Sequence, residues 1–201
     1  MAFMHRTVYL VLRHTPFQES SLVISGITPD LGRLNFIVKG ARRTGKKSFP
    51  QIGLFRELEV EFRIPDDRNS LMTLSRMDLL TEFDHLALHT ENYIAACEFA
   101  RFLLTNVKPM LAAEQSYAAL KTMLRAFCAS DRPEPWLTLA RLSFLNEAGL
   151  LPEPEGEREA VLLSALLSAA QGTGGMPELS EEYLLKLSGW VKRLLRHHGF
   201  H

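Results

Sequence analysis

Hydrophobic residues in the first 80 positions alternate with polar ones at a period of two, which predicts β-strands. The clearest run is 57–64, where Leu58, Val60, Phe62 and Ile64 alternate with charged residues. Less regular runs occupy residues 8–13, 22–24, 33–39 and 71–79. Turn-forming residues separate them at 29–32 and 65–70. Five short strands with no helix between them predict a small closed or half-closed barrel.

After residue 90 the hydrophobic period becomes helical. Helices are predicted over residues 91–107, 114–129, 136–148 and 158–170, and from Ser180 towards His197. Thr90 and Ser180 suit the N-cap position, and Gly149 suits the left-handed position that ends a helix. The fold class is therefore α+β, with a β-barrel domain at 1–80 followed by an all-α helical bundle at 81–201.

Composition places the chain among soluble globular proteins. Hydrophobic residues make up 46% of it and charged residues 23%, which allows a buried core. No apolar run reaches the roughly 18 residues of a membrane span, and the N-terminus has no signal-peptide pattern. Cys97 and Cys128 are too few for a disulfide framework. We therefore expect a cytoplasmic protein with no membrane partner.

The formal net charge is zero, but the charges are segregated. Residues 1–50 hold eight basic and two acidic side chains, whereas residues 51–84 hold four basic and eight acidic ones. From residue 183 onward there are four basic residues, three histidines and no acid. Segregation of this kind indicates a local anionic partner, although a basic loop in solvent gives the same pattern.

Residues 40–47, Gly-Ala-Arg-Arg-Thr-Gly-Lys-Lys, follow a predicted strand and nearly match a phosphate-binding loop. Lys47 stands where a magnesium-binding hydroxyl is required, and Ser48-Phe49-Pro50 does not begin a helix. A basic hairpin between barrel strands is the better interpretation. An NTPase or a nuclease remains the rival class, and it needs a metal-binding carboxylate cluster that the sequence does not show.

Neither a metal site nor a catalytic group is predicted. The two cysteines lie on separate predicted helices without a Cys-x-x-Cys pair, which favours free buried thiols. His197, His198 and His201 are expected in a solvated tail. Glu57, Glu59 and Glu61 share one parity and are expected on the outer face of a strand. We expect no cofactor, no catalytic residue and no enzymatic activity.

A basic barrel with aromatic residues favours nucleic-acid binding. Arg33 and Lys39 have the same parity on one strand, which places them on one side about 20 Å apart. The basic loop continues this surface, and Phe17 is a candidate for stacking on a base. For Tyr9 we favour core packing. Phosphate contacts do not separate DNA from RNA, so an RNA-binding or ribosome-associated OB-fold protein stays open.

Three segments resemble the RecO family of bacterial recombination mediators. Residues 11–22, Val-Leu-Arg-His-Thr-Pro-Phe-Gln-Glu-Ser-Ser-Leu, are similar to the family's first strand and its turn. Residues 28–34 and 38–43, which end in Lys39-Gly40-Ala41-Arg42, are similar to its most distinctive stretch. Residues 142–152 resemble the exit from its helical domain.

This resemblance implies an N-terminal OB-fold and a helical domain. It implies a bacterial, nucleoid-associated DNA repair and recombination mediator that binds single- and double-stranded DNA, anneals complementary strands and acts with RecR. Its substrate would be DNA coated by single-strand-binding protein, onto which RecA is then loaded. The resemblance implies, from the matching positions, that Arg33, Lys39, Arg42 and Arg43 contact DNA. Lys46 and Lys47 are added as DNA-binding candidates because of their charge alone.

The resemblance also implies that the helical domain binds the acidic, hydrophobic-ended tail of single-strand-binding protein. Trp136 and Arg141, with Leu137, Leu139 and Leu142, suggest a slot on the helix at 136–148, and Arg125 is expected across it. The same helix face also suits the bundle core. Many relatives carry a four-cysteine zinc element after the exit, but residues 153–157 are acidic and lack cysteine, so no zinc is implied.

Overall fold

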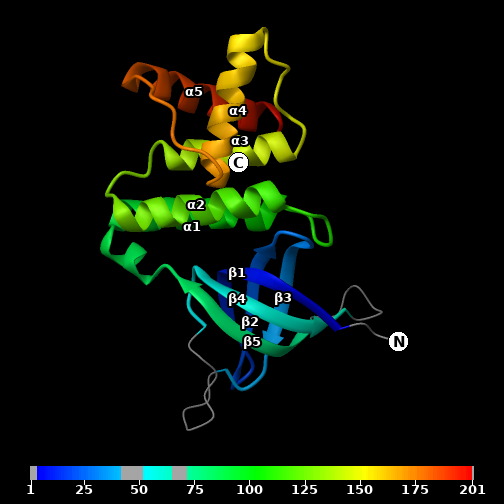
Figure 1. Cartoon of the computed structure of the whole chain (residues 1–201). Helices are drawn as coiled ribbons and strands as arrows, with labels where there is room; N and C mark the ends of the chain where they lie inside the picture. Colours follow the sequence, from blue (N-terminus) through cyan, green and yellow to red (C-terminus); the bar gives the residue numbers. More distant parts are fainter. Residues whose placement is uncertain (1–3, 42–51, 65–71, 201) are drawn as a thin grey trace. The chain divides into compact units, whose positions relative to one another are not determined.

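The computed structural model describes residues 4–41, 52–64 and 72–200. Five strands occupy the first part of the chain: β1 (Met4–Phe17), β2 (Ser21–Thr28), β3 (Gly32–Val38), β4 (Arg56–Arg63) and β5 (Met72–Glu82). They close into a barrel in the order β1-β2-β3-β5-β4 (Figure 1). The predicted strands and the predicted barrel are confirmed.

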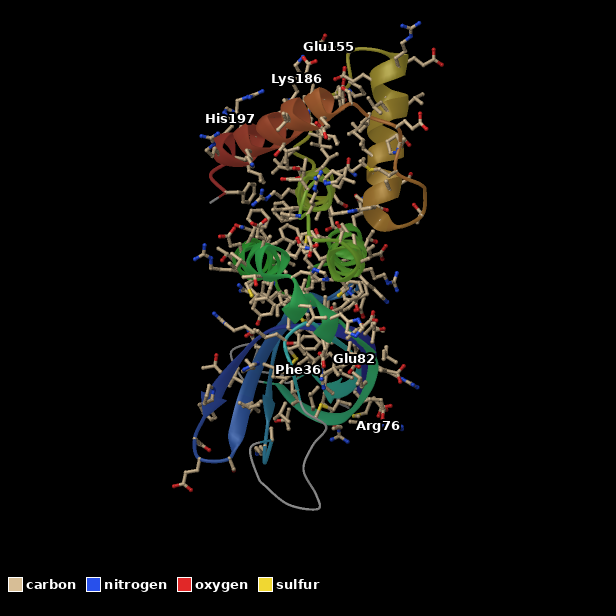
Figure 2. All side chains as sticks on the ribbon, turned by 90° about the vertical axis from the view of Figure 1, so that its left-hand side faces the viewer. Phe36, Arg76, Glu82, Glu155, Lys186 and His197 are labelled. Atoms are coloured by element: carbon tan, nitrogen blue, oxygen red, sulfur yellow. The ribbon has the colours of Figure 1, made fainter. Side chains whose placement is uncertain are left out.

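Closure of the barrel depends on one parallel pairing, which aligns Phe36 with Met72 and Ile37 with Thr73. Every other pairing is antiparallel. The period-two pattern holds in β4, where Leu58, Val60 and Phe62 face the core. Figure 2 shows Phe36 inside the barrel and Arg76 on its outer side. The rings of Tyr9, Phe36 and Phe62 pack edge to face, with centroids 5.1 and 4.9 Å apart.

Three carboxylates were expected on the outer face of the barrel, and the most buried of them is Glu57. Glu59 and Glu61 are half-buried on that face, but Glu57 is only 2% exposed and is therefore buried. Glu57 pairs with Leu10, which is also fully buried and is not part of the barrel core, so the outer face is covered at this position. The odd or even position of a residue in a strand predicts which side its side chain is on. It does not predict whether other parts of the protein cover that side.

The turn between β2 and β3 lies under residues 104–113. Main-chain hydrogen bonds join Met110 N–H to the Leu31 carbonyl and Ala113 N–H to the Pro29 carbonyl, both at 2.8 Å. Gly32 has φ of 59°, and a Cβ there would lie 2.3 Å from the Leu111 oxygen. Only glycine fits so close an approach. This end of the barrel is therefore covered.

A short 3₁₀-helix (Asp84–Leu88) leads into five α-helices: α1 (Thr90–Asn106), α2 (Glu114–Ala129), α3 (Trp136–Glu147), α4 (Glu157–Gln171) and α5 (Glu181–His197). Ser180 caps α5, because its hydroxyl accepts from the Tyr183 N–H at 3.2 Å. Gly149 has φ of 68°, and Leu150 N–H bonds to the Leu145 carbonyl at 2.9 Å. The helix ends predicted at Ser180 and Gly149 are confirmed, whereas Thr90, predicted as an N-cap, is the first residue of α1.

The chain forms two compact units. The first comprises residues 1–84 and 100–113, and the second comprises residues 85–99 and 114–201. The domain boundary expected after residue 80 stays a prediction. Within the second unit α2 and α3 supply most of the large buried side chains, among them Leu120, Phe127, Leu139 and Leu142. None of the helices in the described ranges is long and apolar enough to cross a membrane.

Candidate nucleic-acid interface

The end of the barrel opposite residues 104–113 lies where β1 ends, β2 begins and β3 ends. Pro16 pairs with Leu22, and Leu22 pairs with Val38, so these three residues form one row across three strands. One residue further along, Phe17 ends β1 and Lys39 follows β3. Because β1 and β3 run in the same direction and are separated by one strand, Phe17 and Lys39 lie about 10 Å apart.

Phe17 and Lys39 belong to the outer face of β1 and β3. Arg13 pairs with Ser25, and Ser25 pairs with Asn35, so all three lie on one face. Phe17 and Lys39 share the parity of that face. Arg13, Phe17 and Lys39 are all exposed, and Phe17 is 37% exposed. The face therefore offers two cations and one ring to a ligand.

Three arginines elsewhere on the barrel are held in ion pairs. Arg6 is paired with Glu59, Arg56 with Asp84 at 2.6 Å, and Arg76 with Asp78 at 2.8 Å. The bond to Asp84 raises the pKa of Arg56. Over residues 4–41, 52–64 and 72–200, neither Arg13 nor Lys39 takes part in an ion pair. Their charges are available to an anionic ligand.

Arg33 lies at the opposite, covered end of β3. Its Nη1 donates to the main-chain carbonyl of Leu104 at 2.5 Å, and its Nε is buried. Leu104 belongs to the last turn of α1, whose carbonyls lack partners within the helix. Arg33 therefore caps this helix end. Its role in contacting DNA stays a prediction.

The remaining predicted DNA-binding residues, Arg42, Arg43, Lys46 and Lys47, lie outside the described residues, as does Phe49. The chain enters that segment directly after Lys39, through Gly40 and Ala41. Tyr9 is fully buried, and its hydroxyl donates to the Leu34 carbonyl at 3.3 Å, so the core interpretation is confirmed. Phe17, the candidate for base stacking, is the last residue of β1 and pairs with Ser21.

Sequence reasoning missed Arg13 as a site residue. Its parity with Phe17 on a single strand is the signal that identifies it, because residues 13, 15 and 17 share a side. A register shift between Val11 and Arg13 interrupts the strand just before this run. Before the bulge the odd-numbered Tyr9 and Val11 face the core, whereas after it the odd-numbered Arg13 and Phe17 face outward, so a single alternation does not describe the whole strand.

The predicted partner residues of the helical unit lie in three different settings. Arg125 is exposed on α2, Trp136 is half-buried at the start of α3, and Arg141 is half-buried. Burial lowers the pKa of Arg141, and the nearby carboxylates Glu134 and Glu98 oppose this effect. Leu137, Leu139 and Leu142 are buried in the core, so they do not line an open slot.

Cys97 and Cys128 are both half-buried, and burial raises the pKa of Cys97. Within the described ranges, no group of three or more His, Cys, Asp or Glu side chains is arranged to hold a metal ion. The site that the barrel presents is therefore one of cations and an aromatic ring rather than of metal ligands.

A closed five-stranded barrel of this kind is an OB-fold, a class that binds oligonucleotides and oligosaccharides on its sheet face and loops. Residues 1–83 match the family "Recombination protein O N terminal". This match and two relatives confirm the resemblance to the RecO family.

Two curated relatives extend the likeness beyond the barrel. The DNA repair protein RecO of Photobacterium profundum is 28% identical over 144 residues, which cover 69% of this chain and 57% of the relative. The DNA repair protein RecO of Symbiobacterium thermophilum is 26% identical over 147 residues, which cover 71% and 56%. The chain thus aligns with little more than half the length of these relatives.

Proposed function

We propose that this protein binds single- and double-stranded DNA through its barrel and acts as a mediator of DNA repair and recombination. One observation carries the proposal: a barrel of the RecO family presents Phe17 and Lys39 in one row, on a face whose described cations are unpaired. Cations hold the phosphates of a strand, and an exposed ring stacks on a base. The basic segment at 42–47 extends this face by sequence.

The finer activity follows from the family. The protein anneals complementary strands and, with RecR, helps to load RecA onto DNA coated by single-strand-binding protein. Support comes from the order of the three similar sequence segments and from the names of the relatives, which are DNA repair proteins. A mediator of this type positions strands and partners and needs no catalytic residue.

Salt-dependent binding tests the DNA surface. Each phosphate contact on a single strand contributes about −0.7 to the slope of log affinity against log salt. Replacing Arg42, Arg43, Lys46 and Lys47 by alanine should therefore reduce the slope by roughly 3. The matched control is Arg76→Ala, which removes a cation already paired with Asp78 and should leave the slope unchanged. An unchanged slope in the fourfold variant places the DNA surface elsewhere.

The helical unit offers a groove for the acidic tail of single-strand-binding protein. It lies between the segment 132–135 and α5 and has a volume of about 470 Å³. Leu184 and Leu185 supply its apolar surface, and Leu185 is 74% exposed. Arg132 and Lys192 also line it and supply the positive charge that holds a terminal carboxylate.

Two carboxylates also line this groove, Glu134 and Glu181. Glu134 is already bonded, since one oxygen accepts from the Thr138 N–H at 3.2 Å and the other from the Ser188 hydroxyl at 3.5 Å. Trp136 follows the groove segment directly, whereas Arg141 and Arg125 are not among the residues that line it. We therefore place the tail in this groove and not on the buried face of α3.

A further inference from the structure

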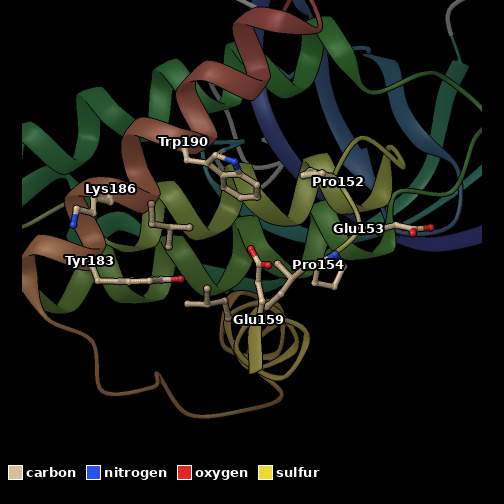
Figure 3. A pocket seen from close by; sticks show the side chains of 10 residues that line it. Pro152, Glu153, Pro154, Glu159, Tyr183, Lys186 and Trp190 are labelled. Carbon is tan, nitrogen blue, oxygen red and sulfur yellow. The ribbon is translucent and has the colours of Figure 1, made fainter. Parts of the chain in front are cut away.

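A second concave site lies in the helical unit, between the segment 152–154, α4 and α5 (Figure 3). Its volume is about 220 Å³. Its base is formed by the buried Leu166 and Leu187 with the half-buried Leu163, and its walls are formed by Tyr183, Trp190 and the two prolines. Sites for drug-sized ligands typically have volumes of about 300–1,000 Å³. This pocket therefore suits one side chain of a partner.

The charge directed into the pocket is negative. Figure 3 shows the carboxylate of Glu159 pointing between Tyr183 and Trp190, whereas the Lys186 ammonium and the Glu153 carboxylate point away. The N–H of Glu155 donates to one oxygen of Glu159 at 2.8 Å and fixes the side chain in place. The Lys186 ammonium is held by Glu182 at 2.6 Å, so it does not neutralise Glu159.

We propose that this pocket receives an arginine side chain of a basic partner polypeptide. A guanidinium is planar, stacks on the face of a tryptophan or tyrosine ring, and donates to a carboxylate in the same plane. The pocket supplies both features, two aromatic side chains and one inward carboxylate, above an apolar base that accommodates the methylene stem. The site shares no lining residue with the groove at 132–135.

The test follows the indole N–H signals of the full 201-residue chain in ¹H–¹⁵N spectra. Trp190 reports on the pocket, and Trp136, the only other tryptophan in the sequence, is the internal control. The probe is the blocked tripeptide acetyl-Ala-Arg-Ala-amide. Its control is the same peptide with citrulline, which keeps the shape of arginine and lacks the charge. We expect a saturable shift of Trp190 with the arginine peptide and none with citrulline.

Glu159→Gln should weaken binding of the arginine peptide roughly two- to five-fold, as expected for one exposed ion pair with a cation–π contact. The matched variant is Glu157→Gln, an exposed residue in the same helical turn that does not line the pocket and should bind like the parent. Circular dichroism should show both variants folded. Equal binding of the citrulline peptide, unchanged binding by Glu159→Gln, equal shifts of both tryptophans or no shift at all would overturn the proposal.

Discussion

Arg33 and Leu104, 71 positions apart in the sequence, are joined by a hydrogen bond of 2.5 Å from the guanidinium to the main-chain carbonyl. The bond places a cation at the carbonyl end of α1, where the helix dipole favours it. It also directs Arg33 towards the segment that covers the β2–β3 turn. Lys39, at the other end of the same strand, is exposed. One strand thus carries a structural cation and a cation available to a ligand.

Arg33→Ala should lower the free energy of unfolding by about 1–3 kcal/mol, because it leaves the Leu104 carbonyl without its partner. The slope of single-strand affinity against salt should stay the same. Urea unfolding and a salt titration on the same variant measure both quantities. A reduced slope with unchanged stability would contradict the capping role and restore Arg33 as a DNA contact.

Lys39→Ala should give the opposite result. Loss of one phosphate contact should reduce the salt slope by about 0.7. Because the side chain is exposed, the free energy of unfolding should change by less than about 0.5 kcal/mol. The pair of variants compares two cations of one strand, so each serves as the control for the other. Parent-like binding by Lys39→Ala would show that this end of β3 is not part of the DNA surface.

Phe17→Ala should weaken single-strand binding by about 1–3 kcal/mol, the usual contribution of one base stacked on an aromatic ring. The salt slope should not change, because no phosphate contact is lost. Fluorescence anisotropy at two salt concentrations separates the two effects. Phe17→Tyr, which keeps the ring, is the matched variant and should bind like the parent. Loss of affinity in both variants would indicate that Phe17 acts by packing.

Most of the fold could be predicted from local patterns. The alternation at Leu58, Val60 and Phe62 predicts a strand with one buried face, and Ser180 and Gly149 mark helix ends through their own backbone chemistry. The parallel pairing of Phe36 with Met72 could not be predicted in this way. It joins segments 36 residues apart, and no short-range pattern encodes the partner of a strand edge.

The candidate site was predictable only in part. Parity on β3 indicates that Arg33 and Lys39 share a side, and it does not show that residues 104–113 cover one end of that side. Arg13 lies just beyond the register shift, where odd-numbered residues face outward although the odd-numbered Tyr9 and Val11 face the core, and local alternation does not reveal such a shift. On α3, helical spacing of apolar residues is the same for a partner-binding slot and for a face packed in the core. The structure shows that Leu139 is buried, so this face belongs to the core.

Asp30 links stability to pH. Burial alone would raise its pKa, but hydrogen bonds from Thr7 (2.6 Å) and His5 (2.8 Å) outweigh it and lower the pKa below its usual value. A lowered folded-state pKa gives stability that is present above the unfolded-state value, near 4, and is lost as the pH falls through the folded-state value. The stability difference between the parent and Asp30→Asn should therefore be full at pH 6 and shrink towards pH 2.

Glu19→Gln is the control for this measurement, because Glu19 is an exposed carboxyl in the turn between β1 and β2. Its difference from the parent should be small and nearly constant over the same pH range. Urea midpoints at several pH values measure both variants. A difference for Asp30→Asn that grows on acidification would contradict the direction of the pKa shift.

The tail groove is tested by two pairs of variants. Arg132→Ala and Lys192→Ala should each weaken binding of a peptide with the acidic, hydrophobic-ended tail sequence by several-fold, because each removes a cation beside its carboxylates. Arg125→Ala and Arg141→Ala should bind like the parent. Peptide titration by anisotropy gives the affinities, and circular dichroism checks the fold. If Arg125→Ala and Arg141→Ala weaken peptide binding while Arg132→Ala and Lys192→Ala do not, the tail binds at α3 and not in this groove.

The mediator role is tested most directly by annealing of complementary DNA strands that are coated with single-strand-binding protein. The chain should accelerate annealing when that protein carries its acidic C-terminal tail. Acceleration should fall sharply when the tail is deleted, while annealing of uncoated strands should be unaffected. Absence of acceleration on both coated and uncoated strands, with the chain folded, would contradict the account.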